Sequence, residues 1–286
     1  SFGGIALADS ALVFQSDFGL KDGAVSAMNG VAYGVDQDLD MYNLTHNITP
    51  FDIWEGAYRL HQTATYWPEG TVFVSLVDPG VGTESKSIIL KTKTGHYFVT
   101  PDNGTVTLVA DNMGVEEVRI IDESKHRLKG SQASHTFHGR DVYAYTGAKL
   151  ASNKISFEEV GPKLEDEVVK IKYQKAKKEG NKVMGTIPIL DVQYGNVWTN
   201  IPKKYIDKLN VDYGDMFEVK IYHKDKLIYS DKVPFCASFG DVKNGKPLLY
   251  LNSLLNLSIA LNWDDFAGAY GIEAGPNWKF VATKIE

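Results

Sequence analysis

The chain has 286 residues and a formal net charge of -6, and 43% of its residues are hydrophobic and 23% charged. A chain of this length can bury one large or two medium cores without a disulfide or a metal. The acidic balance, with no basic stripe, argues against nucleic acid as a partner. No run approaches the roughly 20 apolar residues that a membrane span needs.

Cysteine usage and the first residues bear on the compartment. Cys236 is the only cysteine, so the chain can form neither an internal disulfide nor a cysteine-based zinc site. This usage is typical of a reducing compartment, and we expect a cytoplasmic protein. The alternative is export, because Ala6-Leu7-Ala8 has the A-x-A pattern that precedes many signal-peptide cleavage sites.

Residues 9–172 alternate strand and helix patterns, which predicts an N-terminal α/β domain with a central, mostly parallel sheet. Apolar runs indicate buried strands, and apolar residues at helical spacing indicate helices. In such sheets ligands collect beyond the carboxyl ends of strands, where Asp17, Asp78 and Asp102 lie. The predicted strands span residues 11–14, 41–44, 71–77, 87–90, 96–100 and 118–121, and the predicted helices residues 24–35, 49–66, 105–113 and 141–151.

The pattern changes at residues 173–182, a polar, basic and glycine-containing segment that we predict to be a linker. Residues 183–286 then carry short, closely spaced strand patterns and one clear helix pattern at 202–209. This spacing is typical of a small β-barrel or sandwich, and we expect a C-terminal β-barrel domain. The predicted strands span residues 183–192, 216–223, 226–230, 248–251, 257–261 and 278–285.

Two segments of the N-terminal domain place an ionisable side chain next to glycines. They are Val77 to Thr83, which contains Asp78, and Thr136 to Asp141, which contains His138. Glycine lets the backbone turn sharply and lets a ligand approach closely. A carboxylate and an imidazole on two such loops can position and deprotonate a water molecule. The alternative is a pair of tight turns with solvated polar residues.

Two further segments have the chemistry to bind a nucleoside. Asp17 ends a predicted strand before a glycine, where a carboxylate can accept both hydroxyls of a ribose; the alternative is a helix cap. Residues 191–200 gather a carboxylate, amides and aromatic rings around Gly195. Aromatic faces can stack on a purine and amides can read its edge. The alternative here is a β-turn with Trp198 in the core.

Motifs for other chemistries are missing from the sequence. His135 and His138 lie three apart in a loop without the H-E-x-x-H helix of a zinc site, so we expect no metal. The chain has no G-x-S-x-G elbow, no P-loop and no G-x-G-x-x-G, which leaves serine hydrolases, kinases and dinucleotide dehydrogenases without support. We expect His96, His126 and His223 at the surface.

Taken together and in order, the motifs resemble the S-adenosyl-L-methionine (SAM) hydroxide adenosyltransferase family, which also contains the fluorinase and the chlorinase. One such motif would be weak evidence, but the whole set spans nearly the entire chain. The matching segments are SDFG from Ser16, TPFDIWEGA from Thr49, VDPGVGT from Val77, PDNG from Pro101, TFHGRD from Thr136, GNVWTN from Gly195, LNS from Leu251 and SIALN from Ser258.

The resemblance implies an α/β domain followed by a β-barrel, and a homotrimer with active sites between subunits. SAM would be the substrate, so no separate cofactor is expected. Asp17 would bind the ribose diol, and Phe51 stands where the halogenases carry a tryptophan against the ribose and methionine. The further substrate-binding residues implied are Phe137 and Gly139 beside His138, Asp191 and Ser253 at the methionine amino and carboxylate groups, Tyr194, Asn196, Trp198 and Phe239 around the adenine, and Asn262 in the corresponding late loop.

Asp78 separates the two activities of this family. The implied reaction is an in-line attack at the ribose C5′ carbon, with methionine leaving as a neutral thioether. The fluorinase has a neutral aromatic hydroxyl where this chain has Asp78, and a carboxylate would repel a halide. Two like charges about 4 Å apart at an effective dielectric constant near 20 cost roughly 4 kcal/mol. We therefore expect hydrolysis to adenosine and L-methionine, with His138 sharing the attacking water or its proton, and a SAM-dependent halide transferase is the alternative.

One position departs from the pattern of the hydrolytic branch. Ser85 stands where those proteins carry an arginine beside the aspartate and histidine, and Lys86 follows it. Lysine supplies a charge but no planar, bidentate fork. We assign Ser85 and Lys86 to the catalytic group with Asp78 and His138. A non-catalytic protein that binds SAM or adenosine is the alternative that this departure leaves open.

Overall fold

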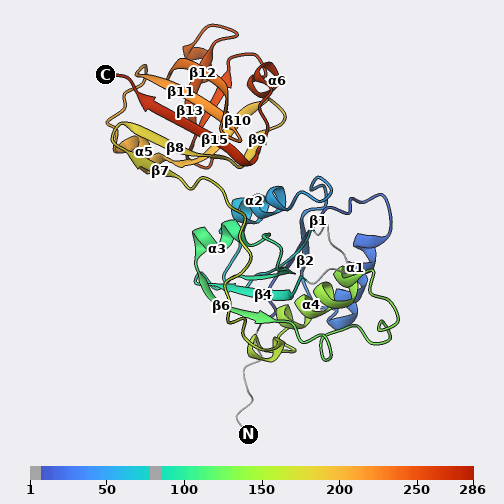
Figure 1. Cartoon of the computed structure of the whole chain (residues 1–286). Coiled ribbons are helices and arrows are strands. Elements are labelled where there is room, and N and C mark those ends of the chain that lie inside the picture. Colours follow the sequence, from blue (N-terminus) through green and yellow to red (C-terminus); the bar gives the residue numbers. More distant parts are fainter. Residues whose placement is uncertain (1–7, 78–84) are drawn as a thin grey trace. The chain divides into compact units, whose positions relative to one another are not determined.

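The computed structural model describes residues 8–77 and 85–286, which form two compact units that divide after Lys170 (Figure 1). The segment from Asp78 to Glu84 lies outside the described residues, as do Ala6 and Leu7 of the N-terminal pattern. Within the described ranges, no helix is long and apolar enough to cross a membrane.

The first unit is built on a six-stranded mixed sheet in the order β2-β1-β3-β5-β4-β6. The strands β2, β1, β3 and β5 run parallel, whereas β4 pairs antiparallel with both β5 and β6. The predicted hairpin of residues 87–90 and 96–100 is confirmed, because a short turn can join only antiparallel strands. The strands are β1 (Leu12–Ser16), β2 (Met41–Thr45), β3 (Val72–Leu76), β4 (Ser87–Thr92), β5 (Tyr97–Pro101) and β6 (Val115–Ile120).

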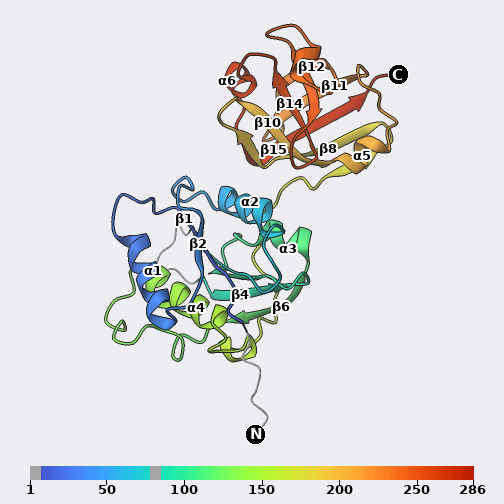
Figure 2. The ribbon, with the colours of Figure 1, turned by 180° about the vertical axis from the view of Figure 1, so that it is seen from behind.

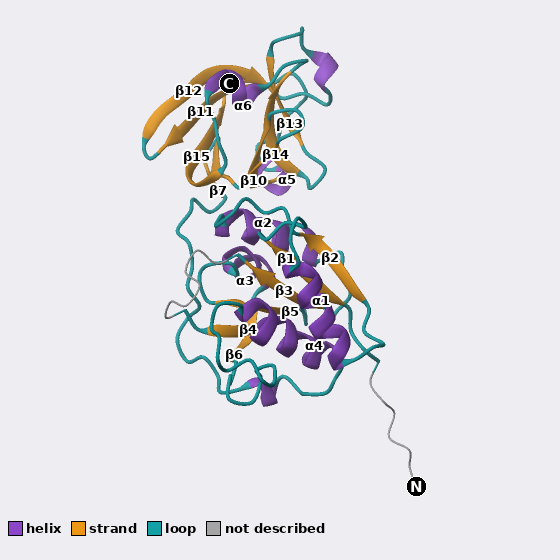
Figure 3. Ribbon diagram, turned by 90° about the vertical axis from the view of Figure 1, so that its right-hand side faces the viewer, coloured by secondary structure: helices purple, strands orange, loops and turns teal. Residues whose placement is uncertain are grey.

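Helices lie on both faces of this sheet, as Figure 3 shows. Helices α1 (Ala24–Val35) and α4 (Tyr145–Ala151) pack on one face. Helices α2 (Ile53–Ala64) and α3 (Thr107–Met113) pack on the other face. Residues of β1 alternate between the two cores, Leu12 and Phe14 entering one and Val13 the other. This alternation is the two-residue period of a strand buried on both faces.

The second unit consists of two antiparallel sheets that pack on a shared core, seen from behind in Figure 2. One sheet has the order β13-β14-β10-β9 and the other β12-β11-β15-β8-β7, and short helices α5 (Lys203–Asp207) and α6 (Phe266–Tyr270) accompany them. An antiparallel β unit is thus confirmed, whereas closure into a barrel stays a prediction. The strands are β7 (Lys177–Glu179), β8 (Lys182–Ile187), β9 (Ile189–Asp191), β10 (Asn196–Pro202), β11 (Met216–His223), β12 (Lys226–Pro234), β13 (Pro247–Leu251), β14 (Asn256–Leu261) and β15 (Gly275–Lys284).

Three local expectations need correction. The predicted helix at 49–66 begins only at Ile53, because Phe51 has a positive φ of 67° and Asp52 caps the helix by accepting from Glu55 N. The predicted strand at 183–192 is interrupted at Pro188, which has no N–H for the ladder. Residues 177–179 of the predicted linker form β7.

The expectation that His96 and His126 lie at the surface is wrong. Both side chains are buried, with 6% and 4% of their surface exposed. The Nε2 atom of His96 is 2.8 Å from the carbonyl oxygen of Trp67, and that of His126 is 2.8 Å from the carbonyl oxygen of Glu159. These backbone partners satisfy the polar ring atoms away from water.

Candidate functional site

A cavity of about 230 Å³ opens in the first unit where β1, β3 and β5 reach their carboxyl ends. This is the edge at which the sequence predicted a ligand. Three predicted site residues, Phe137, His138 and Gly139, line the cavity together with Leu76, the last residue of β3. The other lining residues are Phe18, Ala24, Pro101, Thr136 and Tyr143.

His138 immediately precedes a π-helical turn, Gly139–Ala144, that continues into α4. The backbone approaches β3 closely here, since a Cβ atom added to Gly139 would lie 2.9 Å from Leu76 Cδ1. The Phe137 ring packs edge-on against Phe18, with centroids 6.0 Å apart. His138 is therefore held beside the strand end that leads into Asp78. Asp78 itself lies outside the described residues, so its pairing with His138 stays a prediction.

Asp17 lies in the loop after β1 and is joined to Phe51, the second predicted ribose contact. Asp17 Oδ2 accepts a hydrogen bond from Phe51 N at 2.9 Å, and Asp17 N donates to Leu76 O at 3.3 Å. The Phe51 side chain is 65% exposed. The structure thus brings together Asp17 and Phe51, and Asp17 is tied to the cavity wall through Leu76.

A buried relay supports the Asp17 loop. Ser16 Oγ is 2.7 Å from His46 Nδ1, and His46 Nε2 is 2.9 Å from Asn43 Oδ1. Burial lowers the pKa of His46, which favours the neutral ring. An amide oxygen can only accept, so Nε2 carries the proton and Nδ1 accepts the hydroxyl proton of Ser16. Ser16 Oγ in turn accepts from Phe18 N at 3.3 Å, which fixes the turn that contains Asp17.

Ser85 and Lys86 are exposed just before β4 and do not line the described cavity. The charge of Lys86 instead affects the carboxylate of Asp102, which is buried directly after β5. Burial raises the pKa of Asp102, while a hydrogen bond from Val169 N at 2.9 Å and the charge of Lys86 oppose that rise. The assignment of Ser85 and Lys86 to the catalytic group stays a prediction.

The second unit presents a polar and aromatic face on its four-stranded sheet. Trp198 of β10 pairs with Ser258 of β14, which pairs with Tyr250 of β13, so the three residues form one row across the sheet. Asn196 lies two residues from Trp198 and therefore on the same face. The Phe239 ring packs against Tyr250 with centroids 5.0 Å apart.

The polar atoms of this face are shielded from water. Burial raises the pKa of the Tyr250 hydroxyl to about 12, against a lowering by Trp198, Ser258 and Asn196. The Tyr250 hydroxyl lies near the indole N–H of Trp198. Within the described residues, however, this N–H makes no hydrogen bond of good geometry. A buried donor in that state favours a ligand acceptor.

The remaining predicted residues of the second unit differ in position. Asp191 pairs with Asn196 across the β9–β10 hairpin, and Tyr194 is exposed in its turn. Ser253 is exposed in the turn between β13 and β14. Asn262 is buried, and its Nδ2 donates to Val242 O at 2.8 Å, so this side chain already has a structural partner.

Sequence reasoning missed two tyrosines. Tyr143 lines the cavity of the first unit, and its hydroxyl accepts from Ser87 Oγ at 2.8 Å. Tyr250 lies at the centre of the face on the second unit. Tyr143 could have been found four residues beyond Gly139 on the predicted helix. Tyr250 could have been found from Asn252 of the LNS motif, because residues two apart on a strand lie on the same face.

Comparison with known proteins identifies the class to which these two units belong. The model of the SAM hydroxide adenosyltransferase N-terminal domain matches residues 12–161, and that of the C-terminal domain matches residues 185–279. The chain belongs to the SAM hydroxide adenosyltransferase family.

Particular relatives carry two kinds of name. An (R)-S-adenosyl-L-methionine hydrolase from Methanocaldococcus jannaschii is 36% identical over 84% of this chain and 86% of its own length. A hydrolase of the same name from Thermus thermophilus is 30% identical, covering 92% of this chain and 96% of its own. A fluorinase from an Actinoplanes species is 27% identical over 92% of this chain and 95% of its own.

Solved structures agree with the fold. An uncharacterized conserved protein from Thermotoga maritima superposes with a TM-score of 0.82 at 34% identity, covering 95% of this chain and 99% of its own. A conserved hypothetical protein from Thermus thermophilus gives a TM-score of 0.72 at 26% identity, covering 96% of this chain and all of its own.

Proposed function

We propose that the protein hydrolyses SAM to adenosine and L-methionine. One observation carries the proposal: His138 lines a cavity at the carboxyl end of β3, and Asp78 follows that strand in the sequence. Relatives named as SAM hydrolases at 30% and 36% identity support the same activity. The reaction needs no cofactor, and we place it in the cytoplasm.

The proposed chemistry forms a bond between water oxygen and the ribose C5′ carbon and breaks the bond from C5′ to sulfur. The sulfonium takes the electron pair and leaves as neutral methionine, so no general acid is required. His138 and Asp78 orient the water and accept its proton. Alignment of a nucleophile can supply up to about 7–11 kcal/mol, and a positioned base typically adds roughly 10²–10⁴-fold in rate.

Different residues bind the ribose, the adenine and the methionine groups of SAM. Asp17 accepts the ribose hydroxyls, and the Trp198 and Phe239 rings enclose the adenine, to which the indole N–H can donate. Asp191 and Ser253 hold the methionine amino and carboxylate groups. We further propose the family's β-barrel for the second unit and a homotrimer with active sites between its subunits.

The test is incubation of the pure full-length protein with SAM, with and without chloride or fluoride, followed by chromatography. Adenosine and methionine in equal amounts are expected in every mixture. A halogenated deoxyadenosine would instead establish the halide transferase. Unchanged SAM with measurable SAM binding would establish a non-catalytic binding protein.

The role of Asp78 is tested by Asp78→Asn, which keeps the shape of the side chain and removes its charge. Turnover is expected to fall on the order of 10²- to 10⁴-fold, because the water loses its base, while SAM binding by calorimetry is retained. Full turnover in this variant would contradict the assignment. Asp38→Asn, at an exposed residue outside the cavity lining, serves as the control.

A further inference from the structure

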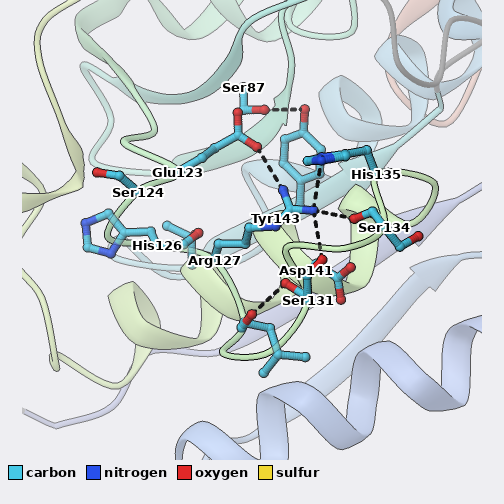
Figure 4. A network of polar contacts seen from close by, with 12 residues as sticks. Ser87, Glu123, Ser124, His126, Arg127, Ser131, Ser134, His135, Asp141 and Tyr143 are labelled. Atoms are coloured by element: carbon cyan, nitrogen blue, oxygen red, sulfur yellow. Dashed lines mark hydrogen bonds and ion pairs between the residues drawn. The ribbon is translucent and has the colours of Figure 1, made fainter.

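Arg127 carries a guanidinium that contacts Ser131, Ser134 and His135 (Figure 4), in the segment that precedes His138 in the sequence. Only 9% of its side chain is exposed. Its Nη2 donates to the carbonyl oxygen of Ser134 at 2.7 Å and, at 3.4 Å each, to the carbonyl oxygen of Ser131 and His135 Nδ1. Its single carboxylate partner in the described residues, Glu123, is 3.6 Å away.

Within the described residues, the other hydrogen bonds of the segment that Arg127 holds are local, joining Ser131 to Leu128 and Ser134 to Ser131 and Thr136. Residues 132–136 are exposed. Leu128 N donates to Asp141 O at 2.7 Å, and this hydrogen bond joins the two ends of the loop from Leu128 to Asp141. Between those ends, Thr136, Phe137 and His138 line the cavity. Arg127 therefore replaces water as the hydrogen-bonding partner of the carbonyl oxygens just before the cavity-lining residues.

The same guanidinium constrains an imidazole beside His138. A guanidinium can only donate, so His135 Nδ1 must accept and the proton of this ring must lie on Nε2. The His135 and His138 rings meet edge to face, with centroids 6.2 Å apart. Arg127 thus contacts the imidazole that packs on His138.

We propose that Arg127 is a positioning residue for the reaction, which acts through His135 and the backbone of residues 131–135 to hold His138 in the cavity. This inference rests on the proposed function. A guanidinium suits the task because Nη2 reaches the loop acceptors while Nη1 faces Glu123, and the planar group keeps these two nitrogens in a fixed relation, which the single nitrogen of an ammonium group does not offer. Its Nε is buried and has no hydrogen-bond partner in the described residues, so burying this guanidinium costs free energy. A role in positioning the loop, rather than in stability, accounts for that cost.

The test compares Arg127→Ala with Arg119→Ala in the full-length protein. Arg119 is a matched control, because it is also largely buried, bonded to a carboxylate and donates to a loop carbonyl, Gly161 O at 3.1 Å. For Arg127→Ala we expect kcat to fall on the order of 10- to 100-fold with KM for SAM changed less than about threefold. Arg119→Ala is expected to keep the wild-type kcat.

Chemical rescue separates positioning from loss of stability. Methylguanidinium added to Arg127→Ala should raise kcat saturably, and it should change neither the wild type nor Arg119→Ala. Amide hydrogen exchange of residues 131–137 should be faster in Arg127→Ala and slow again with methylguanidinium. Arg127→Lys retains the charge and the aliphatic stem, and its kcat should lie between those of the wild type and Arg127→Ala. It provides a folded variant if Arg127→Ala does not fold.

The outcomes distinguish the inference from the proposed function. A wild type that releases no adenosine from SAM would remove the proposed function. An active wild type whose Arg127→Ala and Arg127→Lys variants turn over normally would overturn the positioning role alone. A rise in KM at unchanged kcat would also overturn it, since that result would place Arg127 in substrate binding.

Discussion

At the scale of single residues, His46 links a protonation state to the loop that carries Asp17. Its folded-state pKa is lowered by burial, so in acid the unfolded chain binds more protons than the folded one. The stability that the neutral ring contributes is complete above about pH 6.5 and is lost as pH falls toward the folded pKa. Burial also lowers the pKa of His61 and His126, which adds to the same acid sensitivity.

We therefore expect His46→Gln to lower stability at pH 7.5 by about 1–3 kcal/mol, because Ser16 and Asn43 lose a buried partner. The variant should also lose less stability than the wild type between pH 7.5 and 5. Urea unfolding across this range measures both effects. His223→Gln is the control, and equal pH slopes in wild type and His46→Gln would refute the argument.

How far the sequence predicted the site also depends on single residues. Motifs identified Phe137, His138 and Gly139, which line the cavity, and named Asp17 and Phe51 separately, whose hydrogen bond only the structure shows. They did not identify the supporting partners. No motif marks Arg127, whose acceptors lie in the irregular loop that follows it, and the loop conformation that gathers them has no periodic signal in the sequence. Ser16 and His46 are 30 residues apart, and only the tertiary fold brings them together.

At the scale of elements, the π-helical turn Gly139–Ala144 determines where His138 lies. Such turns are rare and are frequently found at functional sites. Periodicity predicted a helix from Asp141 to Ala151 but could not predict the wider turn, because the close approach of Gly139 to β3 is a tertiary contact. Strand β10 (Asn196–Pro202) was missed for a related reason, since its amides and Trp198 indicated a binding turn rather than a strand.

The turn yields a prediction for Gly139→Ala. The added Cβ would lie 2.9 Å from Leu76 Cδ1 and 3.3 Å from the Phe137 ring, so the segment must shift. We expect a loss of about 1–3 kcal/mol in unfolding free energy and a lower kcat, since His138 adjoins the substituted residue. Gly30→Ala in α1 is the control, because its Cβ would meet nothing within 4 Å. That control should be neutral or stabilising by up to about 1 kcal/mol, and an equal result for both glycines would contradict the prediction.

At the scale of the whole molecule, the α/β unit carries the residues proposed for the chemistry, and the β unit carries those proposed for the purine. Sequence patterns predicted two domains, because strand and helix patterns alternate in the first part of the chain and short strand patterns dominate the second. The division also predicts that the two halves affect different kinetic constants. Substitutions on the face of the β unit should change binding, because adenine contacts do not alter between the bound substrate and the transition state at C5′.

Phe239→Ala tests this division directly. Its ring is 40% exposed and packs on Tyr250, so its removal should weaken adenine binding with little effect on the fold. Loss of one stacking ring is worth about 1–3 kcal/mol, so KM for SAM and Kd for adenosine should rise roughly 5- to 150-fold while kcat stays close to wild type. Tyr213→Ala is the control, since Tyr213 is 69% exposed in the same unit and stacks on Phe235 rather than Tyr250. A fall in kcat at unchanged adenosine affinity would move Phe239 from substrate binding to the chemical step, and the proposed division of labour would be wrong.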